Sequence, residues 1–414
     1  MSTDDRARMA GSSRRGRLVA GSALAIVLAL AAWTLFGPDR VRRGRVSGVK
    51  LLGLDRPFPE AGRYPGDPYV GSLVCAECHP GESATHAGSG HARTLRPAGD
   101  RELARQLDGM NVEDPERPGV HWRYGYREGD LHVERTEGGR VEDLVIQYAF
   151  GSGHHATTFL TVVDPAFPEV LEHRLTYFAR EQSMGLTPGH RAGVGMAGVG
   201  ERGGALIGDD ARNCFGCHTT QISSPPGRSI DASTMIPTVS CERCHGPGRA
   251  HVEAARRGSQ AGSPELRLPF GPGRYSTDAL LRLCGDCHRH PSKIDPSRIR
   301  PDNPNLARFQ PVGLLQSRCL IESGGGLDCV TCHDPHARAS SDHANYRAVC
   351  VSCHAEPDGG CPKAPSGDCI GCHMPRLDAG QHVLFTDHWI RATRPEMRQP
   401  PPPELRPDLR RLGR

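Results

Sequence analysis

A five-residue pattern, Cys-x-x-Cys-His, occurs seven times in this chain and constrains it more than any other feature. Residue frequencies predict roughly 0.03 such patterns by chance, so the repetition is not accidental. The pattern uses 14 of the 16 cysteines. In chain order, motifs 1 to 7 contain the pairs Cys75 and Cys78, Cys214 and Cys217, Cys241 and Cys244, Cys284 and Cys287, Cys329 and Cys332, Cys350 and Cys353, and Cys369 and Cys372.

The spacing within each motif fits covalent attachment of a haem. Two thiols separated by two residues can form thioethers with the two vinyl groups of one haem, and the next residue presents an imidazole to the iron. The proximal iron ligands would be His79, His218, His245, His288, His333, His354 and His373. We therefore expect seven covalently bound haem c groups as cofactors.

Zinc binding and disulfide bonding are the alternatives for a cysteine-rich chain. A zinc site built from Cys-x-x-Cys pairs does not require a histidine directly after every second cysteine. Disulfides would use an even number of cysteines but would leave the seven histidines unexplained. Both alternatives are therefore weak.

The composition indicates that side chains alone do not fill the interior. Apolar residues make up 37% of the chain and aromatic residues 5%, while 50 Gly and 35 Pro interrupt regular structure. The expected fold class is a multihaem cytochrome c, with mainly short α-helices and loops packed around covalent haems and a small antiparallel β insertion. The formal charge of +4 comes without a basic stripe, which argues against a nucleic-acid partner.

The spacing between motifs predicts the domain organisation. A gap of 139 residues separates Cys75 from Cys214, whereas the later motifs begin 19 to 45 residues apart. We expect a first haem segment at 71–99 and a six-haem domain at 201–393. Alternating apolar and polar residues with Gly-Asp and Gly-Gly turns predict a β-rich insertion at 100–200.

The two ends of the chain have sequence patterns that differ from those of the motif region. Behind an arginine cluster, the uncharged run Leu18 to Phe36 is long enough to cross a bilayer. Residues 1–37 are therefore predicted to be a membrane anchor, with a cleaved signal peptide as the alternative because the run contains an Ala-x-Ala pattern. Residues 38–70 resemble a linker, and residues 394–414 a Pro-rich disordered tail.

This N-terminus also predicts the compartment. Haem attachment to Cys-x-x-Cys-His follows export, so the body is expected on the periplasmic side of the cytoplasmic membrane, N-terminally anchored. A soluble periplasmic form after signal cleavage is the alternative.

Each iron needs a sixth ligand or has an open position. Of the 21 histidines, seven belong to motifs, so the other 14 are enough for bis-histidine ligation of every haem. With only eight methionines, His-Met ligation is less favoured. The distal candidates are His91, His154, His190, His251, His336, His382 and His388, whereas His121, His132 and His173 are expected to be structural.

Several segments together resemble a known family. They are YVGSLVCAECHPGE with SGHA, IQYAFGSG, TPGH, CFGCH, CERCHGPGRAH, CHDPH, CIGCHMPR and FTDHW, and they span about residues 69 to 391. The set is similar to multihaem cytochromes of the cytochrome c-554 type, which are related to hydroxylamine oxidoreductase and pentahaem nitrite reductase. The resemblance implies closely packed haem pairs that relay electrons, and distal ligation by His251 and also by His91, His336 and His388.

The chain departs from this family in two ways. It has seven motifs instead of four, so the ligand pairing of a tetrahaem carrier does not transfer whole. Where relatives often place Trp before SxH, this chain has His86, which leaves the ligand of the first region open.

Two functions remain open. A carrier would have six-coordinate, low-spin irons and would pass electrons from a membrane quinol-oxidising donor to an external acceptor. An enzyme would need a haem with a vacant position for nitrite, hydroxylamine or an oxidised sulfur compound. The chain contains no Cys-x-x-Cys-Lys motif, the attachment signature of the pentahaem nitrite reductase active site, and the carrier is favoured.

The two cysteines outside the motifs, Cys319 and Cys361, generate the first prediction. Outside the cytoplasm they are expected to form a disulfide, with a thiolate ligand to iron as the alternative. Non-reducing peptide mapping should recover the two peptides linked. Recovery of both as free thiols would refute the disulfide.

Overall fold

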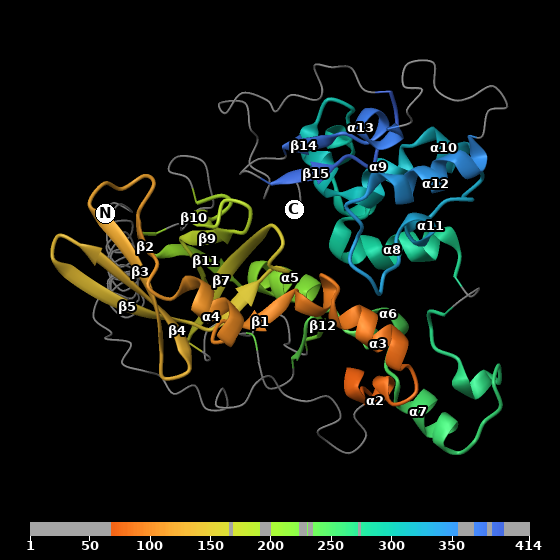
Figure 1. The fold of residues 1–414 in the computed structure, drawn as a ribbon, viewed down its shortest axis with the longest axis horizontal. Helices are drawn as coiled ribbons and strands as arrows, with labels where there is room; N and C mark the ends of the chain where they lie inside the picture. The colour runs from red at the N-terminus through yellow and green to blue at the C-terminus, as the bar shows by residue number, and fades with distance from the viewer. Residues whose placement is uncertain are drawn as a thin grey trace, which may run out of the picture. The chain divides into compact units, whose positions relative to one another are not determined.

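The computed structural model describes most of the chain that follows the predicted linker. The described ranges are 68–164, 169–190, 200–222, 230, 235–271, 275–354, 368–378 and 383–392. The chain divides into two compact units, Met1–Leu51 and Leu52–Arg414, and the described residues all belong to the second (Figure 1). The predicted anchor and tail, Cys361 and His382 lie outside these ranges. Within them, no helix is both long and apolar enough to cross a membrane.

A four-stranded antiparallel sheet is formed by consecutive hairpins. Its strands, in order, are β2 (Asn111–Glu113), β3 (Val120–Arg127), β4 (Asp130–Glu137) and β5 (Arg140–Ile146). Glu128 and Gly129, and then Gly138 and Gly139, have positive φ angles, as the two-residue turns that fit the twist of hairpin strands require. Alternate residues of β3 and β4 are buried, so one face of this sheet packs on a core.

A seven-stranded sheet lies beside the first one. Its strands are β1 (Leu95–Pro97), β6 (Tyr148–Phe150), β7 (Ala156–Asp164), β8 (Glu169–His173) and β11 (Gly203–Ile207), with β9 (Leu175–Phe178) and β10 (Ser183–Leu186) attached through β7. One apolar cluster includes Trp122 and Tyr124 of β3 together with Phe159 of β7. The two sheets therefore share a core, against which α4 (Arg101–Leu107) also packs.

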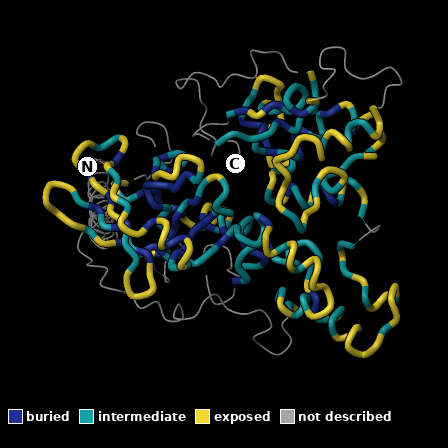
Figure 2. Tube along the Cα trace, viewed as in Figure 1, coloured by how far each residue is buried: buried dark blue, intermediate teal, exposed yellow. Residues whose placement is uncertain are grey.

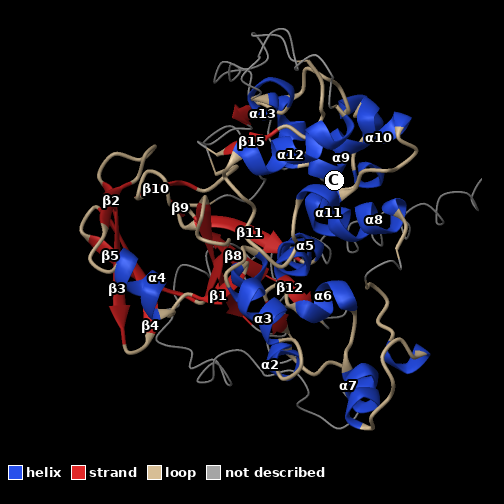
Figure 3. Cartoon of the chain, turned by 45° about the vertical axis from the view of Figure 1, so that its right-hand side comes forward, coloured by secondary structure: helices blue, strands red, loops and turns tan. Residues whose placement is uncertain are grey.

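The extent of β-structure corrects the expected fold class. Strands β1 to β11 run from Leu95 to Ile207 and form two sheets, which is more than a small insertion in a mainly helical protein (Figure 3). The reason is that this segment contains enough β-branched and aromatic residues to bury a core of its own. The predicted six-part division of the chain stays a prediction.

Short helices contain motif cysteines: α2 (Ser72–Ala76), α5 (Asp209–His218), α6 (Cys241–His245), α8 (Thr277–His288), α11 (Cys329–Cys332), α12 (His343–Cys353) and α13 (Cys369–His373). Between them lie α3 (Pro80–Ala87), α7 (Arg249–Arg256), α9 (Gln310–Leu315) and α10 (Arg318–Glu322), which contain none. Two small hairpins accompany them: β12 (Thr219–Gln221) with β13 (Ile236–Pro237), and β14 (Arg376–Asp378) with β15 (Leu384–Thr386).

Side-chain burial differs sharply between the two kinds of structure. In the described part of the chain after α7, one apolar cluster contains only four buried residues, Ile294, Leu306, Phe309 and Val312. Helix α12 has no buried residue along its eleven-residue length. Figure 2 shows the dark blue tube concentrated in the sheets and mostly teal and yellow tube in the later helices. Groups other than side chains must therefore fill part of the helical region.

A buried ion pair ties the two sheets together. Arg174 donates a hydrogen bond of 2.9 Å to Asp114 Oδ1, and Trp122 Nε1 donates one of 3.1 Å to Oδ2. The two charged side chains are 3% and 0% exposed. Burial is the largest single influence and would raise the pKa of Asp114. The hydrogen bonds from Arg174, the Glu116 amide and Trp122, together with the charge of Arg174, outweigh it, so the pKa is lowered.

Removing this buried carboxylate should destabilise the β part. Asp114→Asn keeps the shape but leaves Arg174 as a buried cation with Glu116, 3.5 Å away, as a partial counter-ion. We expect a loss of roughly 3 kcal/mol in unfolding free energy, measured by far-UV circular dichroism during denaturation. Since the folded pKa is lowered, the stabilising effect is present at neutral pH and is lost as the pH falls through that pKa.

The matched control is Asp278→Asn, at an exposed pair with Arg282 on α8. It should leave the unfolding transition unchanged. Equal stability of the wild type and Asp114→Asn at neutral pH would contradict the role of the buried pair.

Candidate haem sites

In each motif a helical turn brings the two thiols that attach the haem and the imidazole that ligates iron to one side of the backbone. Residues three and four positions apart share one face of a helix, so the two thiols and the imidazole converge. Helices α5, α6, α8 and α13 each end with a complete motif. In motifs 5 and 6 the histidine follows the helix, and its amide donates to the first cysteine: His333 to Cys329 and His354 to Cys350, both at 3.0 Å.

The motif residues fit covalent haem. Thioether formation needs thiols that a macrocycle can reach, and each motif cysteine is either half-buried or exposed.

Four pairs of imidazole rings face each other across a gap that one iron can bridge. With metal–nitrogen bonds of about 2.0 Å and about 1.1 Å from nitrogen to ring centre, two trans imidazoles have centroids about 6 Å apart. The observed pairs are His79 with His251 at 6.3 Å, His91 with His288 at 6.3 Å, His245 with His336 at 6.0 Å and His333 with His388 at 6.2 Å. Each pair joins one motif histidine to one predicted distal candidate.

Hydrogen bonds at Nδ1 orient these rings. A carbonyl oxygen can only accept, so an Nδ1 beside one must carry the proton, which leaves the Nε2 lone pair for a metal. His251 donates from Nδ1 to Leu266 O at 2.8 Å, and His245 donates to Phe270 O at 2.8 Å. His388 does the same with Thr386 O at 2.9 Å.

The imidazole of His388 also meets the charge requirement for a ligand. Burial lowers its pKa to about 4, so the ring is neutral near neutral pH. A neutral imidazole keeps the lone pair that iron binds.

Cysteines of different motifs lie against one another. Four pairs lie close enough for their thiols to interact: Cys75 with Cys241, Cys217 with Cys287, Cys284 with Cys329, and Cys350 with Cys369. These contacts bring motif 1 against motif 3, motif 2 against motif 4, motif 4 against motif 5, and motif 6 against motif 7. Cys332 and Cys350 also interact electrostatically, which places motif 5 near motif 6.

An ion-pair bridge links motif 3 to motif 4. Asp286, inside motif 4, accepts from Lys293 at 2.7 Å and also pairs with Arg243, inside motif 3. With Cys244 close enough to Cys284 for their charges to interact, this bridge makes the contacts continuous from motif 1 to motif 7.

Known families match two parts of the chain. A family described as cytochrome c554 and c-prime matches residues 202–246, and a family described as doubled CXXCH motif matches residues 323–359. Together with the repeated motif and the relative below, these matches decide the class of protein. The chain is a multihaem c-type cytochrome.

This cytochrome is similar to a curated relative, the dissimilatory sulfite reductase MccA of Wolinella succinogenes. The two are 20% identical over 385 residues, which cover 76% of this chain and 51% of the relative. The chain thus spans about half the length of that protein. Among solved structures it is similar to the outer cell wall cytochrome OcwA, with 13% identity, a TM-score of 0.41, and coverage of 80% of this chain and 81% of that one.

Motif 2 of the cytochrome differs from the paired motifs. His218 donates from Nδ1 to Thr94 O at 2.7 Å, and its ring lies 4.9 Å from the ring of Phe150. Within the described ranges, no imidazole faces His218 in the way that His251 faces His79. The same holds for His354 and His373 of motifs 6 and 7.

Two further distal candidates have different surroundings. His190 is buried and holds Glu172 through Nε2 at 3.0 Å, so the structure places it in a polar contact of the sheet. Among the residues that the structure describes, the buried Nε2 of His154 has no hydrogen-bond partner, and His154 lies near Arg338. Burial lowers the pKa of His154, while the adjacent His155 is exposed.

Sequence reasoning missed two residues that support the motif histidines. The ring of Tyr346 lies 5.3 Å from that of His333, and its hydroxyl is 3.5 Å from Nδ1. Its position one helical turn before Cys350 was the available signal. The Thr94 carbonyl that orients His218 gave no such signal, because any residue supplies a carbonyl.

Removing a facing imidazole should change the spin state of one iron. In His251→Ala, the iron held by His79 would lose the opposite nitrogen, so we expect one high-spin haem per chain in the low-temperature EPR spectrum. His132→Ala is the control, since His132 pairs with Asp143 at 3.1 Å on the exposed side of a hairpin. An EPR spectrum of His251→Ala identical to that of the wild type would exclude the pairing.

Proposed function

We propose that this chain is an exported heptahaem c-type cytochrome that carries electrons through closely packed, mostly bis-histidine haems. The observation that carries the proposal is the close approach of cysteines from different motifs, because thioethers at such cysteines would hold neighbouring macrocycles edge to edge. Bound haem iron supplies one-electron chemistry. The protein contributes attachment, orientation and spacing.

Four of the haems would have two imidazole ligands. The proximal and distal pairs are those with ring centroids 6.0 to 6.3 Å apart: His79 with His251, His288 with His91, His245 with His336, and His333 with His388. Bis-histidine ligation gives lower potentials than ligation by His and Met, which suits a low-potential carrier. His154, with its orphaned Nε2, is the proposed distal ligand for one of motifs 6 and 7.

The order of contacts defines the proposed route. It runs through motifs 1, 3, 4, 5, 6 and 7, with motif 2 joined to it at motif 4 through Cys217 and Cys287. Motif 4 is therefore a junction with three neighbours. A branched route suits a protein that receives electrons at one end and delivers them at another.

A specific observation supports a second candidate function at motif 2. His218, like His354 and His373, has no facing imidazole among the described residues, and a haem held there without a second protein ligand would have an accessible iron face. Such a site could reduce nitrite, hydroxylamine or an oxidised sulfur compound, and the relative from Wolinella succinogenes is named a sulfite reductase. The carrier is preferred because six of the seven motifs form the continuous route.

The proposed cellular location follows from the chemistry of haem attachment. Multihaem cytochromes of this kind exchange electrons with redox partner proteins and are commonly periplasmic. We propose the periplasmic side of the cytoplasmic membrane, anchored through Leu18 to Phe36, with a membrane quinol-oxidising donor and an external acceptor. The soluble periplasmic form is the alternative.

Haem stoichiometry tests the carrier first. Intact mass spectrometry of protein matured in a host that attaches haem c should give the chain plus seven haems. Cys369→Ser with Cys372→Ser should give six, because motif 7 would lose both thioethers. A wild-type mass with fewer than seven haems would contradict the proposal.

Turnover assays then separate the two functions. The fully reduced protein should pass electrons to a general acceptor but should not consume nitrite, hydroxylamine or sulfite. Consumption of any of the three, accompanied by a shift of a high-spin EPR signal, would replace the carrier by the second candidate.

A further inference from the structure

The side chain of Glu242, inside motif 3, joins segments that are distant in the sequence. Its carboxylate accepts three backbone hydrogen bonds: Oε1 accepts from the amides of Val70 at 3.0 Å and Gly248 at 2.8 Å, and Oε2 accepts from the amide of Gly71 at 2.9 Å. The residue is 4% exposed. Because protein groups already surround this carboxylate, its position does not depend on where the macrocycles lie.

Two of these segments lead directly into the groups that would hold one haem. Gly71 precedes helix α2, which contains Cys75 of motif 1. Gly248 precedes helix α7, and His251 lies in the first turn of that helix. The ring of His251 faces that of His79, the motif 1 histidine, with centroids 6.3 Å apart. One carboxylate in motif 3 therefore fixes the chain on both sides of the haem that motif 1 would hold.

The backbone approaches this carboxylate so closely that a side chain at position 248 would crowd it. A Cβ on Gly248 would lie 3.3 Å from Glu242 Oε1 and 3.3 Å from a methyl carbon of Val70. The amide of Arg249 also donates to Pro68 O at 3.1 Å. The segment before α2 and the start of α7 are therefore packed directly against each other, with Glu242 bonded to both.

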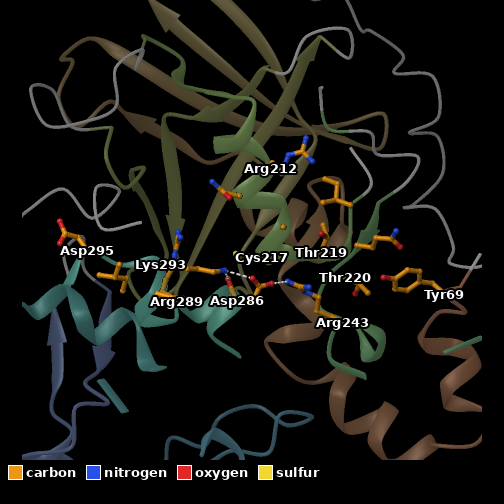
Figure 4. A pocket seen from close by; sticks show the side chains of 16 residues that line it. Tyr69, Arg212, Cys217, Thr219, Thr220, Arg243, Asp286, Arg289, Lys293 and Asp295 are labelled. Atoms are coloured by element: carbon orange, nitrogen blue, oxygen red, sulfur yellow. Dashed lines mark hydrogen bonds and ion pairs between the residues drawn. The ribbon is translucent and has the colours of Figure 1, made fainter. Parts of the chain in front are cut away.

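The charge of Glu242 is not neutralised by an ion pair within the described ranges. The next residue, Arg243, pairs with Asp286 of motif 4 instead (Figure 4). Glu242 lies close enough to Cys75 for its charge to act on that thiol. A buried negative charge beside a haem stabilises the oxidised iron, which carries one more positive charge than the reduced iron, and so lowers the reduction potential.

We propose that Glu242 is a positioning residue for the haem of motif 1. It holds the segment that leads to Cys75 against the helix that carries His251, and its charge lowers the reduction potential where motif 1 meets motif 3. The inference rests on the proposed function, in which electrons pass between these two motifs. The burial of the carboxylate and its three hydrogen bonds do not depend on that function.

Glu242→Gln tests the role of the charge in the full-length, haem-loaded protein. The amide keeps the shape and one oxygen, but it removes the charge and sets an NH2 group against a backbone N–H. At least one of the seven reduction potentials should therefore shift upward in a spectroelectrochemical titration. A titration identical to that of the wild type would overturn the role of the charge.

Glu242→Asp separates position from charge. Aspartate keeps the charge but is one methylene shorter, so its carboxylate cannot reach all three amides. We expect a further high-spin signal of up to one haem per chain in the low-temperature EPR spectrum, as for His251→Ala, while the potentials of the remaining low-spin haems stay as in the wild type. An EPR spectrum identical to that of the wild type would overturn the positioning role.

Glu77→Gln is the matched control, because Glu77 lies in motif 1 and pairs with Arg256 of α7 at 2.8 Å, yet both side chains are more than half exposed. This variant should keep the wild-type potentials and EPR spectrum, since an exposed ion pair contributes little and solvent screens its charge. An equal shift in Glu77→Gln would mean that any carboxylate near motif 1 has the effect, and it would overturn the specific role of Glu242.

Haem content, measured by intact mass, separates this inference from the proposed function. Seven haems in every sample, with unchanged potentials and EPR spectra in the Glu242 variants, would overturn the role of Glu242 alone. Wild-type protein with fewer than seven haems would contradict the proposed function.

Discussion

Under the proposed ligation, the geometry of the helical region depends on the distance that one iron would span between two imidazoles. Residues far apart in the sequence meet at that distance, such as His79 with His251 and His91 with His288, both at 6.3 Å. A metal that joins such segments restricts the unfolded chain much as a crosslink does, so its binding energy becomes folding energy. Haem attachment would therefore stabilise the fold in addition to supplying the redox function.

The sheets and the later helices differ in what fills their interior. The sheets bury Trp122, Tyr124 and Phe159 in a common cluster and need no cofactor to fill it. The later helices are short and α12 buries no residue, so side chains alone give that region little stabilisation from apolar burial. Covalent macrocycles would replace side chains there, which explains how a chain with 5% aromatic residues can remain compact.

The attachment residues can be predicted from local sequence, because haem attachment is encoded within five consecutive positions, and that assignment stays a prediction. The partners across the iron depend on tertiary structure, and the sequence supplied candidates without pairings. His251 and His190 illustrate the limit: both follow a Gly-containing turn, yet one faces His79 and the other holds Glu172. The size of the β part was underestimated, because short strands with bulges give weak periodicity until their neighbours are known.

Motif 2 shows why one motif histidine can lack a facing imidazole without losing its orientation. Helix α5 packs into the apolar core of the larger sheet through Phe215, whose ring contacts Phe150 at 4.9 Å. Phe150 also contacts the ring of His218 at 4.9 Å, and Thr94 O fixes its Nδ1. The sheet therefore holds His218 in place by packing. At motifs 1, 3, 4 and 5 the motif histidine has an opposing imidazole instead. A motif histidine anchored to a pre-formed core therefore keeps its orientation without a second imidazole.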